Sequence, residues 1–138
     1  MSWDVLIINS EKPVDFEKDN WPNFLSKQKI INDITSIFPE TNWDDSSWGI
    51  LENEFADIEF NIGDNENIGN NFMLHIRGGK NPVKEIFKMC SQNSWIAFDL
   101  SSGNYIDENL NQTGFNSWKK HRDEVISKEK VKKPWWKF

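Results

Sequence analysis

The sequence predicts an α+β fold, with a mainly antiparallel sheet and two helices on one of its faces. Two kinds of apolar periodicity predict this class. In several short segments apolar and polar residues alternate, as they do in a strand with one buried face. In two longer segments apolar residues recur at every third or fourth position, as they do in amphipathic helices. The segments follow the order β-α-β-β-β-α-β-β and end with a third helix, which is typical of α+β rather than alternating α/β proteins.

The first half of the chain contains one predicted helix and four predicted strands. Residues 3–8 are an apolar, β-branched run, which predicts a strand that is buried on both faces or central in its sheet. A stripe of isoleucine and phenylalanine side chains predicts a helix over about residues 22–37, ended by Pro39. Three further strands in close succession favour an antiparallel meander, and they cover residues 48–53, 56–62 and 72–77.

A second helix is expected after the third of these strands. Asn81 and Pro82 suit its cap and its first helical position, where proline loses no hydrogen bond. The helix is expected to end near residues 92–93. Its apolar stripe consists of Val83, Ile86, Phe87 and Cys90.

The last part of the chain contains two short strands, a helix and a tail. Residues 95–100 alternate again, and residues 105–107 suit a short return strand. A weaker apolar stripe over residues 115–128 indicates a third helix, and residues 128–138 are a basic, aromatic tail. In the first of these strands, the residues expected to face the core are Ile96, Phe98 and Leu100.

The composition indicates a single cytoplasmic domain over residues 1–138. This is a usual domain size, and no apolar run is long enough for a signal sequence or a membrane span. The single cysteine, Cys90, excludes an internal disulfide, and its place on an apolar helical stripe predicts a buried, unreactive thiol. His75 and His121 lack the spacing of a zinc site, so no metal or cofactor is predicted.

Charge divides the chain into an acidic body and a basic end. Residues 1–117 carry 8 basic and 19 acidic side chains, a net charge of −11, whereas residues 118–138 carry 8 basic and 3 acidic ones, a net charge of +5. An acidic body repels phosphate backbones and attracts basic partners. We therefore expect a basic protein partner and no binding of nucleic acid by the body.

The polar side of the predicted sheet carries the strongest cluster of candidate side chains. In a meander, Glu59 and Asn61 lie across from His75 and Arg77. Asp99 is expected to join them from the strand after the second helix. Three roles are open to this cluster: ion pairs that stabilise the sheet, a binding surface for a protein, or a catalytic histidine–carboxylate pair.

Arg77, Gly78, Gly79 and Lys80 form a predicted corner before the second helix. Free backbone N–H groups, a helix N-terminus and two cations are the features that hold an anion in other proteins. The corner lacks the long glycine-bounded loop and the Lys-Ser/Thr pair of a Walker motif. A tight turn that needs glycine conformations is the simpler interpretation.

Several short sequence elements lie within roughly residues 38–107. They are Phe38-Pro39, Trp48-Gly-Ile50, Ile58-Glu-Phe-Asn-Ile-Gly63, Leu74-His-Ile-Arg-Gly-Gly79, Trp95, Phe98-Asp99, Gly103 and Ile106-Asp107. Together they resemble a family of small bacterial cytoplasmic proteins of uncharacterised function, and the Arg-Gly-Gly and Trp-to-Asp elements are the most specific. The resemblance assigns no activity to any residue, but some small bacterial proteins of this general kind are immunity proteins of toxin systems.

These observations predict a non-enzymatic protein-binding domain, specifically an immunity protein that neutralises a cognate toxin through an acidic surface. The acidic body, the small size and the lack of a complete catalytic motif motivate this expectation. The alternative is a small enzyme or anion-binding domain that uses Glu59, His75, Arg77 and Asp99. The side chains expected to steer or anchor a partner are Asp44, Asp45, Asp57, Glu59, Asp64, Glu66, Trp43 and Trp48.

Three roles are open to the tail, residues 128–138. It can dock back on the acidic body, form a partner site, or contact a membrane or nucleic acid. Exposed rings are unfavourable on a soluble protein, so the first two roles are favoured. The sequence does not define the oligomeric state.

Overall fold

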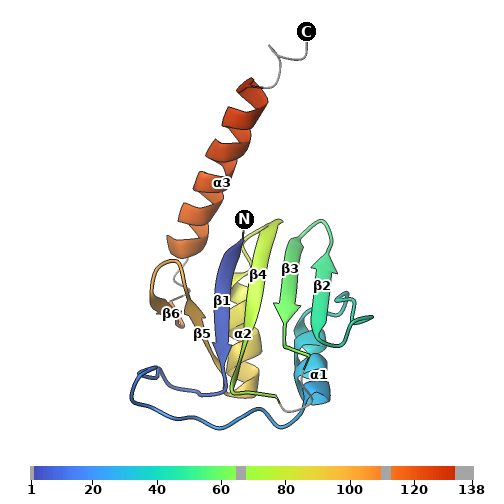
Figure 1. The fold of residues 1–138 in the computed structure, drawn as a ribbon, viewed down its shortest axis with the longest axis vertical. Coiled ribbons are helices and arrows are strands. Elements are labelled where there is room, and N and C mark those ends of the chain that lie inside the picture. The colour runs from blue at the N-terminus through green and yellow to red at the C-terminus, as the bar shows by residue number, and fades with distance from the viewer. Residues whose placement is uncertain (1, 65–67, 110–112, 133–138) are drawn as a thin grey trace.

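Six strands form one sheet in the computed structural model, which describes residues 2–64, 68–109 and 113–132 (Figure 1). The strand order is β2-β3-β4-β1-β5-β6, so the N-terminal strand lies inside the sheet. Every pair of neighbouring strands is antiparallel. The strands are β1 (Trp3–Ile8), β2 (Trp48–Glu52), β3 (Ala56–Asn61), β4 (Asn71–Gly79), β5 (Ile96–Asp99) and β6 (Asn104–Ile106).

Two helices cover one face of this sheet, and a third extends from one end of it (Figure 1). The covering helices are α1 (Lys27–Ile37) and α2 (Val83–Asn93), and the extending helix is α3 (Thr113–Lys132). This arrangement confirms the α+β class, the mainly antiparallel sheet and the pair of helices on one face that the sequence predicts.

The predicted meander of β2, β3 and β4 is present, and β1 lies between β4 and β5. In the β1–β4 pair, Val5 lies opposite Leu74 and Asp4 lies opposite His75. Residues directly opposite each other in an antiparallel pair point to the same face of the sheet. The two strands therefore send matching apolar residues to the helix-covered face, whereas the other face carries both the polar pair Asp4–His75 and the apolar pair Leu6–Met73.

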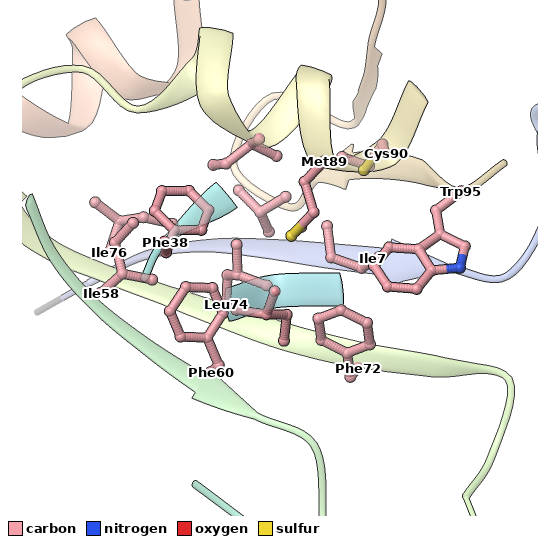
Figure 2. Packing of buried hydrophobic residues seen from close by; sticks show 14 of the residues in the cluster. Ile7, Phe38, Ile58, Phe60, Phe72, Leu74, Ile76, Met89, Cys90 and Trp95 are labelled. Atoms are coloured by element: carbon pink, nitrogen blue, oxygen red, sulfur yellow. The ribbon is translucent and has the colours of Figure 1, made fainter. Parts of the chain in front are cut away.

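The core lies between the sheet and the two covering helices (Figure 2). Ile7 of β1 and Leu74 of β4 are fully buried there. Phe38, which follows α1, packs on Phe60 of β3 with 5.5 Å between the ring centroids. Contacts of this kind attach α1 to the sheet. They stabilise the fold because burial of apolar area is the main favourable term in folding.

α2 begins and packs slightly differently from the prediction. Its first residue is Val83, and Pro82 is the N-cap residue rather than the first helical residue. Asn81 Oδ1 accepts a hydrogen bond from the Val83 N–H at 3.0 Å, so Asn81 does contribute to the start of the helix. Met89 is buried, whereas Phe87 of the predicted stripe is only partly buried.

α1 begins at Lys27, later than the predicted residue 22. The preceding segment uses its backbone groups in other contacts. Asn9 Nδ2 donates to the Pro22 carbonyl oxygen at 3.0 Å, and the Phe24 N–H donates to the Gly69 carbonyl oxygen at 3.0 Å. These contacts hold the segment against the end of the sheet. The apolar stripe that predicted the helix therefore begins several residues before α1 itself.

The observed start of α1 gives a first testable prediction. Ser26 is the N-cap residue, and its Oγ accepts a hydrogen bond from the Lys29 N–H at 3.1 Å. Ser26→Ala is therefore expected to lower the free energy of unfolding by about 1 kcal/mol, measured by urea unfolding. Ser36→Ala, in the last turn of the same helix, is the matched control and is expected to change it far less. Equal losses for the two variants would contradict the observed cap.

The residues of β5 that face the core are not the predicted ones. Ala97 and Asp99 are buried on the helix-covered face, and Leu100 is exposed. The pairing register of β5 with β1 determines which β5 residues face the core, because Ala97 lies opposite the buried Ile7. The prediction that Ile96, Phe98 and Leu100 face inward is therefore wrong. Phe98 packs instead on Phe16 of the loop after β1, with 5.2 Å between the ring centroids.

The two glycines of the predicted corner are the last residues of β4. Gly78 lies opposite Asp57, and Gly79 lies opposite Ala56. The φ angle of Gly79 is +87°, and a Cβ at this position would lie 2.8 Å from the Ala56 Cα. Only glycine fits there, because other residues rarely adopt this backbone conformation.

α3 contacts the body through its first turns and then projects away from it (Figure 1). Phe115 and Trp118 are buried, and the Phe115 ring meets the Trp3 ring edge-on at 5.3 Å. The helix continues to Lys132, so the first residues of the predicted tail are helical. The rest of the tail, residues 133–138, lies outside the described residues.

Candidate functional site

The sheet face opposite α1 and α2 carries the predicted polar cluster, and we call it the open face. Ile50, Glu59, His75 and Asp4 form one row across four strands, because each residue lies opposite the next. The neighbouring rows contain Trp48 with Asn61, and Glu52 with Asp57. The open face is thus defined by Asp4, Trp48, Ile50, Glu52, Asp57, Glu59, Asn61, His75 and Arg77.

His75 is held between an acid and an aromatic ring. Its Nδ1 lies 2.8 Å from Asp4 Oδ1 of the neighbouring strand. The Trp48 ring stacks on the imidazole, with 5.7 Å between centroids and 17° between planes. The carboxylate orients the imidazole, and the stack holds Trp48 in one position.

Arg77 forms an ion pair within the open face. Its Nε donates to Glu59 Oε2 at 2.8 Å. The register of β3 and β4 shifts between Asp57 and Ile58, and Arg77 falls within this irregularity. Because the Arg77 side chain is 42% exposed, water screens the pair and its stabilising contribution is small.

The strands bring Glu59, Asn61, His75 and Arg77 to one face, and Glu59 lies opposite His75 as predicted. Asn61 lies opposite Met73, so the prediction that it faces His75 or Arg77 across the strand pair is wrong. Asp99 does not join them, because it lies on the opposite, helix-covered face and is 3% exposed. Its place beside the histidine is taken by Asp4, which the sequence reasoning did not single out. The sequence signal that could have identified Asp4 is its position as a lone acid in an otherwise apolar first strand.

Three of the predicted partner-binding acids flank the open face. Asp44, Asp45 and Asp64 are exposed near the end of β2 and β3 at which Trp48 lies, and we call them the acidic rim. The Trp48 N–H donates to the Asp45 carbonyl oxygen at 3.2 Å, which joins the rim to the face. Glu66 lies outside the described residues.

Trp43 has a structural position rather than an exposed one. Its Nε1 donates to Thr35 Oγ1 of α1 at 3.1 Å, and its ring packs against Phe60. A Cβ at Gly49 would lie 2.6 Å from the Trp43 ring, so the glycine makes room for this ring. The geometry therefore does not favour Trp43 as a partner anchor, although Trp48 remains accessible.

The predicted anion corner has its groups engaged within the protein. The Lys80 N–H donates to the Phe55 carbonyl oxygen at 2.9 Å, and Lys80 Nζ lies 4.9 Å from the centre of the Phe55 ring. Arg77 is paired with Glu59. Gly78 and Gly79 belong to the sheet, so the tight-turn interpretation fits better than the anion site.

Cys90 is buried, and burial alone raises the pKa of its thiol to about 12. This position agrees with the predicted unreactive thiol. Within the residues that the structure describes, no three His, Cys, Asp or Glu side chains come together as a metal site requires. The described helices all lack the length of apolar sequence that a membrane crossing needs.

The open face combines carboxylates with two accessible apolar side chains, Trp48 and Ile50. Its residues line neither a hollow of about 320 Å³ nor one of about 490 Å³, both of which lie elsewhere in the described part of the chain. Comparison of the chain with protein-family models, curated proteins and solved structures finds no match. The geometry and charge of this face are therefore the features that indicate a function.

Proposed function

We propose that the chain is a non-enzymatic binding protein, specifically an immunity protein that neutralises a cognate bacterial toxin through the open face. One observation carries the proposal: an acidic sheet face, left uncovered by α1 and α2, with a tryptophan and an isoleucine among its carboxylates. The sequence resemblance to small bacterial proteins adds the toxin context. The binding of a basic protein is the part that follows from the chemistry of the face.

The apolar residues of the face suit a protein contact. Ile50 is 44% exposed, and Trp48 is held in place by its stack on His75. A side chain that is already fixed loses little conformational entropy when it is covered. Tryptophan is enriched among the residues that dominate binding energy, so Trp48 is the proposed anchor.

The charges of the face determine which partner it suits. Asp4, Glu52, Asp57 and Glu59 bring four carboxylates to the open face, and Arg77 brings one guanidinium. The acidic rim adds further exposed carboxylates beside Trp48. Such a field accelerates association with a basic protein surface and repels phosphate groups. A nuclease or another toxin with a cationic active-site surface fits this description.

Co-expression with the protein encoded beside this gene tests the proposal. We expect the two proteins to purify as a complex, and we expect the toxic activity to be lost in that complex. The association rate should fall as salt is raised, because the attraction between exposed charges is screened. If no neighbouring gene encodes a protein that binds the chain, the immunity assignment is wrong.

A further inference from the structure

A row of mostly apolar side chains crosses the open face beside its acids. Each residue of the row lies opposite the next one on the neighbouring strand, so all of them point to this face. All of them are partly buried rather than covered. We call this set the apolar row, and from β2 to β5 it consists of Trp48, Asn61, Met73, Leu6 and Phe98.

The apolar surface continues beyond the sheet at the β5 end of the row. Phe16 of the loop after β1 packs on Phe98, with 5.2 Å between the ring centroids. Phe16 is itself 46% exposed, so its ring extends the apolar surface instead of closing it. Contiguous apolar side chains on a protein surface mark interaction sites more often than scattered ones do.

The spacing of the apolar row matches an α-helix. Neighbouring strands lie about 4.8 Å apart, so the five strands from Trp48 to Phe98 span about 19 Å. A helix rises about 5.4 Å per turn, so apolar side chains on successive turns fall close to successive strands, and about 13 residues cover the row. We propose that the open face binds a basic amphipathic helix of the partner protein, laid across the strands along the apolar row. This inference rests on the proposed function, because it specifies which part of the partner the same face receives.

The backbone chemistry of the sheet favours a helix over an extended segment. The strands use their main-chain groups within the sheet, whereas a helix satisfies its own N–H and C=O groups before it is covered. Addition of a strand at the β2 edge is restricted, because Asn42 and Ile50 exchange two backbone hydrogen bonds there, at 2.7 and 3.0 Å. The opposite edge strand, β6, has only three residues. A helix on the open face would add a layer like the one that α1 and α2 form on the other face (Figure 1).

The acids of the open face determine the charge of this helix. Glu59 and Asp4 lie in the row next to the apolar row, with His75 between them. The acidic rim lies beside Trp48. Cations that flank the apolar stripe of a helix would therefore face carboxylates. Lysine and arginine suit these positions, because their apolar stems can lie along the row while their charged ends reach the acids.

Titration of the full-length protein with a synthetic peptide, followed by nuclear magnetic resonance, tests this inference. The probe has about 16 residues, with leucine at every third or fourth position, lysine on both sides of this stripe and alanine elsewhere. We expect it to shift the amide signals of Leu6, Met73 and Phe98. The signals of Ile34 in α1 and Ile86 in α2, on the far side of the sheet, should not move.

Two control peptides separate the helix from its charge alone. One has the same composition in an order that destroys the apolar stripe, and the other has a proline in its centre, which breaks a helix. Both keep the lysines, and both are expected to bind at least about tenfold more weakly than the probe. Equal binding of the proline peptide would show that an extended segment is bound and would overturn the proposal. Shifts confined to the edge strands β2 and β6 would also overturn it.

Variants of the apolar row give the corresponding test on the protein. Leu6→Gln removes an apolar side chain from the centre of the row without changing the charge, and we expect it to weaken binding of the probe about tenfold. Met73→Gln, on the neighbouring strand, tests the row independently of any effect on β1. Leu25→Gln is the matched control, because Leu25 is 85% exposed in the segment before α1, and it should bind the probe unchanged. Thermal unfolding checks that each variant is folded.

The outcomes distinguish this inference from the proposed function. Equal affinity of Leu6→Gln, Met73→Gln and the unchanged protein for the probe would overturn the helix assignment. That result would leave the co-expression test intact, because the co-expression test does not depend on which segment of the partner is bound. Sedimentation of the free protein identifies the remaining occupant. A dimer that Leu6→Gln abolishes would assign the apolar row to a second copy of the chain and would also overturn the proposal.

Discussion

Asp99→Ala is expected to lower the free energy of unfolding by about 3 kcal/mol, the largest stability loss among the changes considered. Asp99 is 3% exposed, and its oxygens accept hydrogen bonds from Trp3 Nε1 at 2.8 Å, Ser101 Oγ at 2.7 Å and Ser102 Oγ at 2.8 Å. The carboxylate therefore joins β1 to the β5–β6 turn. Alanine would leave the buried indole N–H without its acceptor, which costs more than a lost surface hydrogen bond.

Asp99→Asn is the matched control, because it keeps the shape and one acceptor oxygen. Urea unfolding of the two variants should give a clearly smaller loss for asparagine than for alanine. Gly114→Ala probes the same site from α3, since a Cβ at Gly114 would collide with the Asp99 carboxylate. Asp99→Ala with a loss below about 1 kcal/mol would show that the carboxylate does not organise this end of the fold.

Trp48→Ala is expected to weaken binding to the proposed toxin partner by about 30-fold, which corresponds to about 2 kcal/mol. The indole is the proposed anchor of the open face, and its stack on His75 holds it ready for contact. Titration calorimetry measures the affinity, and thermal unfolding checks that the variant is folded.

Trp21→Ala is the matched control for this change. Trp21 is also partly buried, but it lies on the loop after β1, where its Nε1 donates to the Asn70 carbonyl oxygen at 2.8 Å. This variant is expected to bind the toxin as tightly as the unchanged protein. If Trp48→Ala binds equally tightly, the anchor lies elsewhere.

The sequence predicted the elements and the polar face well because both depend on local periodicity. The alternation around Glu59 and His75 was sufficient to place these residues on one face, since neighbouring strands of a meander pair in order. The apolar run of residues 3–8 predicted a strand inside the sheet, which β1 is, but not which strands lie on either side of it. No local pattern shows that Asp4 will pair with His75, because the pairing joins residues that are distant in sequence.

β5 shows why alternation can mislead. Both of its faces carry apolar residues, so the period alone does not show which face points to the helices. Phe98 is covered by the ring of Phe16, and the acid Asp99 is buried because three side chains satisfy its oxygens. A buried acid contradicts the simple rule that polar residues face solvent, and only the tertiary partners explain it.

Charge reversal beside the open face tests most directly whether this surface captures a basic toxin. The variant Asp44→Lys, Glu52→Lys and Asp64→Lys changes three exposed acids of the open face and the acidic rim, and Glu11→Lys, Glu17→Lys and Glu108→Lys makes the same charge change elsewhere. At low salt we expect the first variant to associate with the toxin at least about tenfold more slowly than the second. Equal association rates for the two variants would contradict binding through the open face.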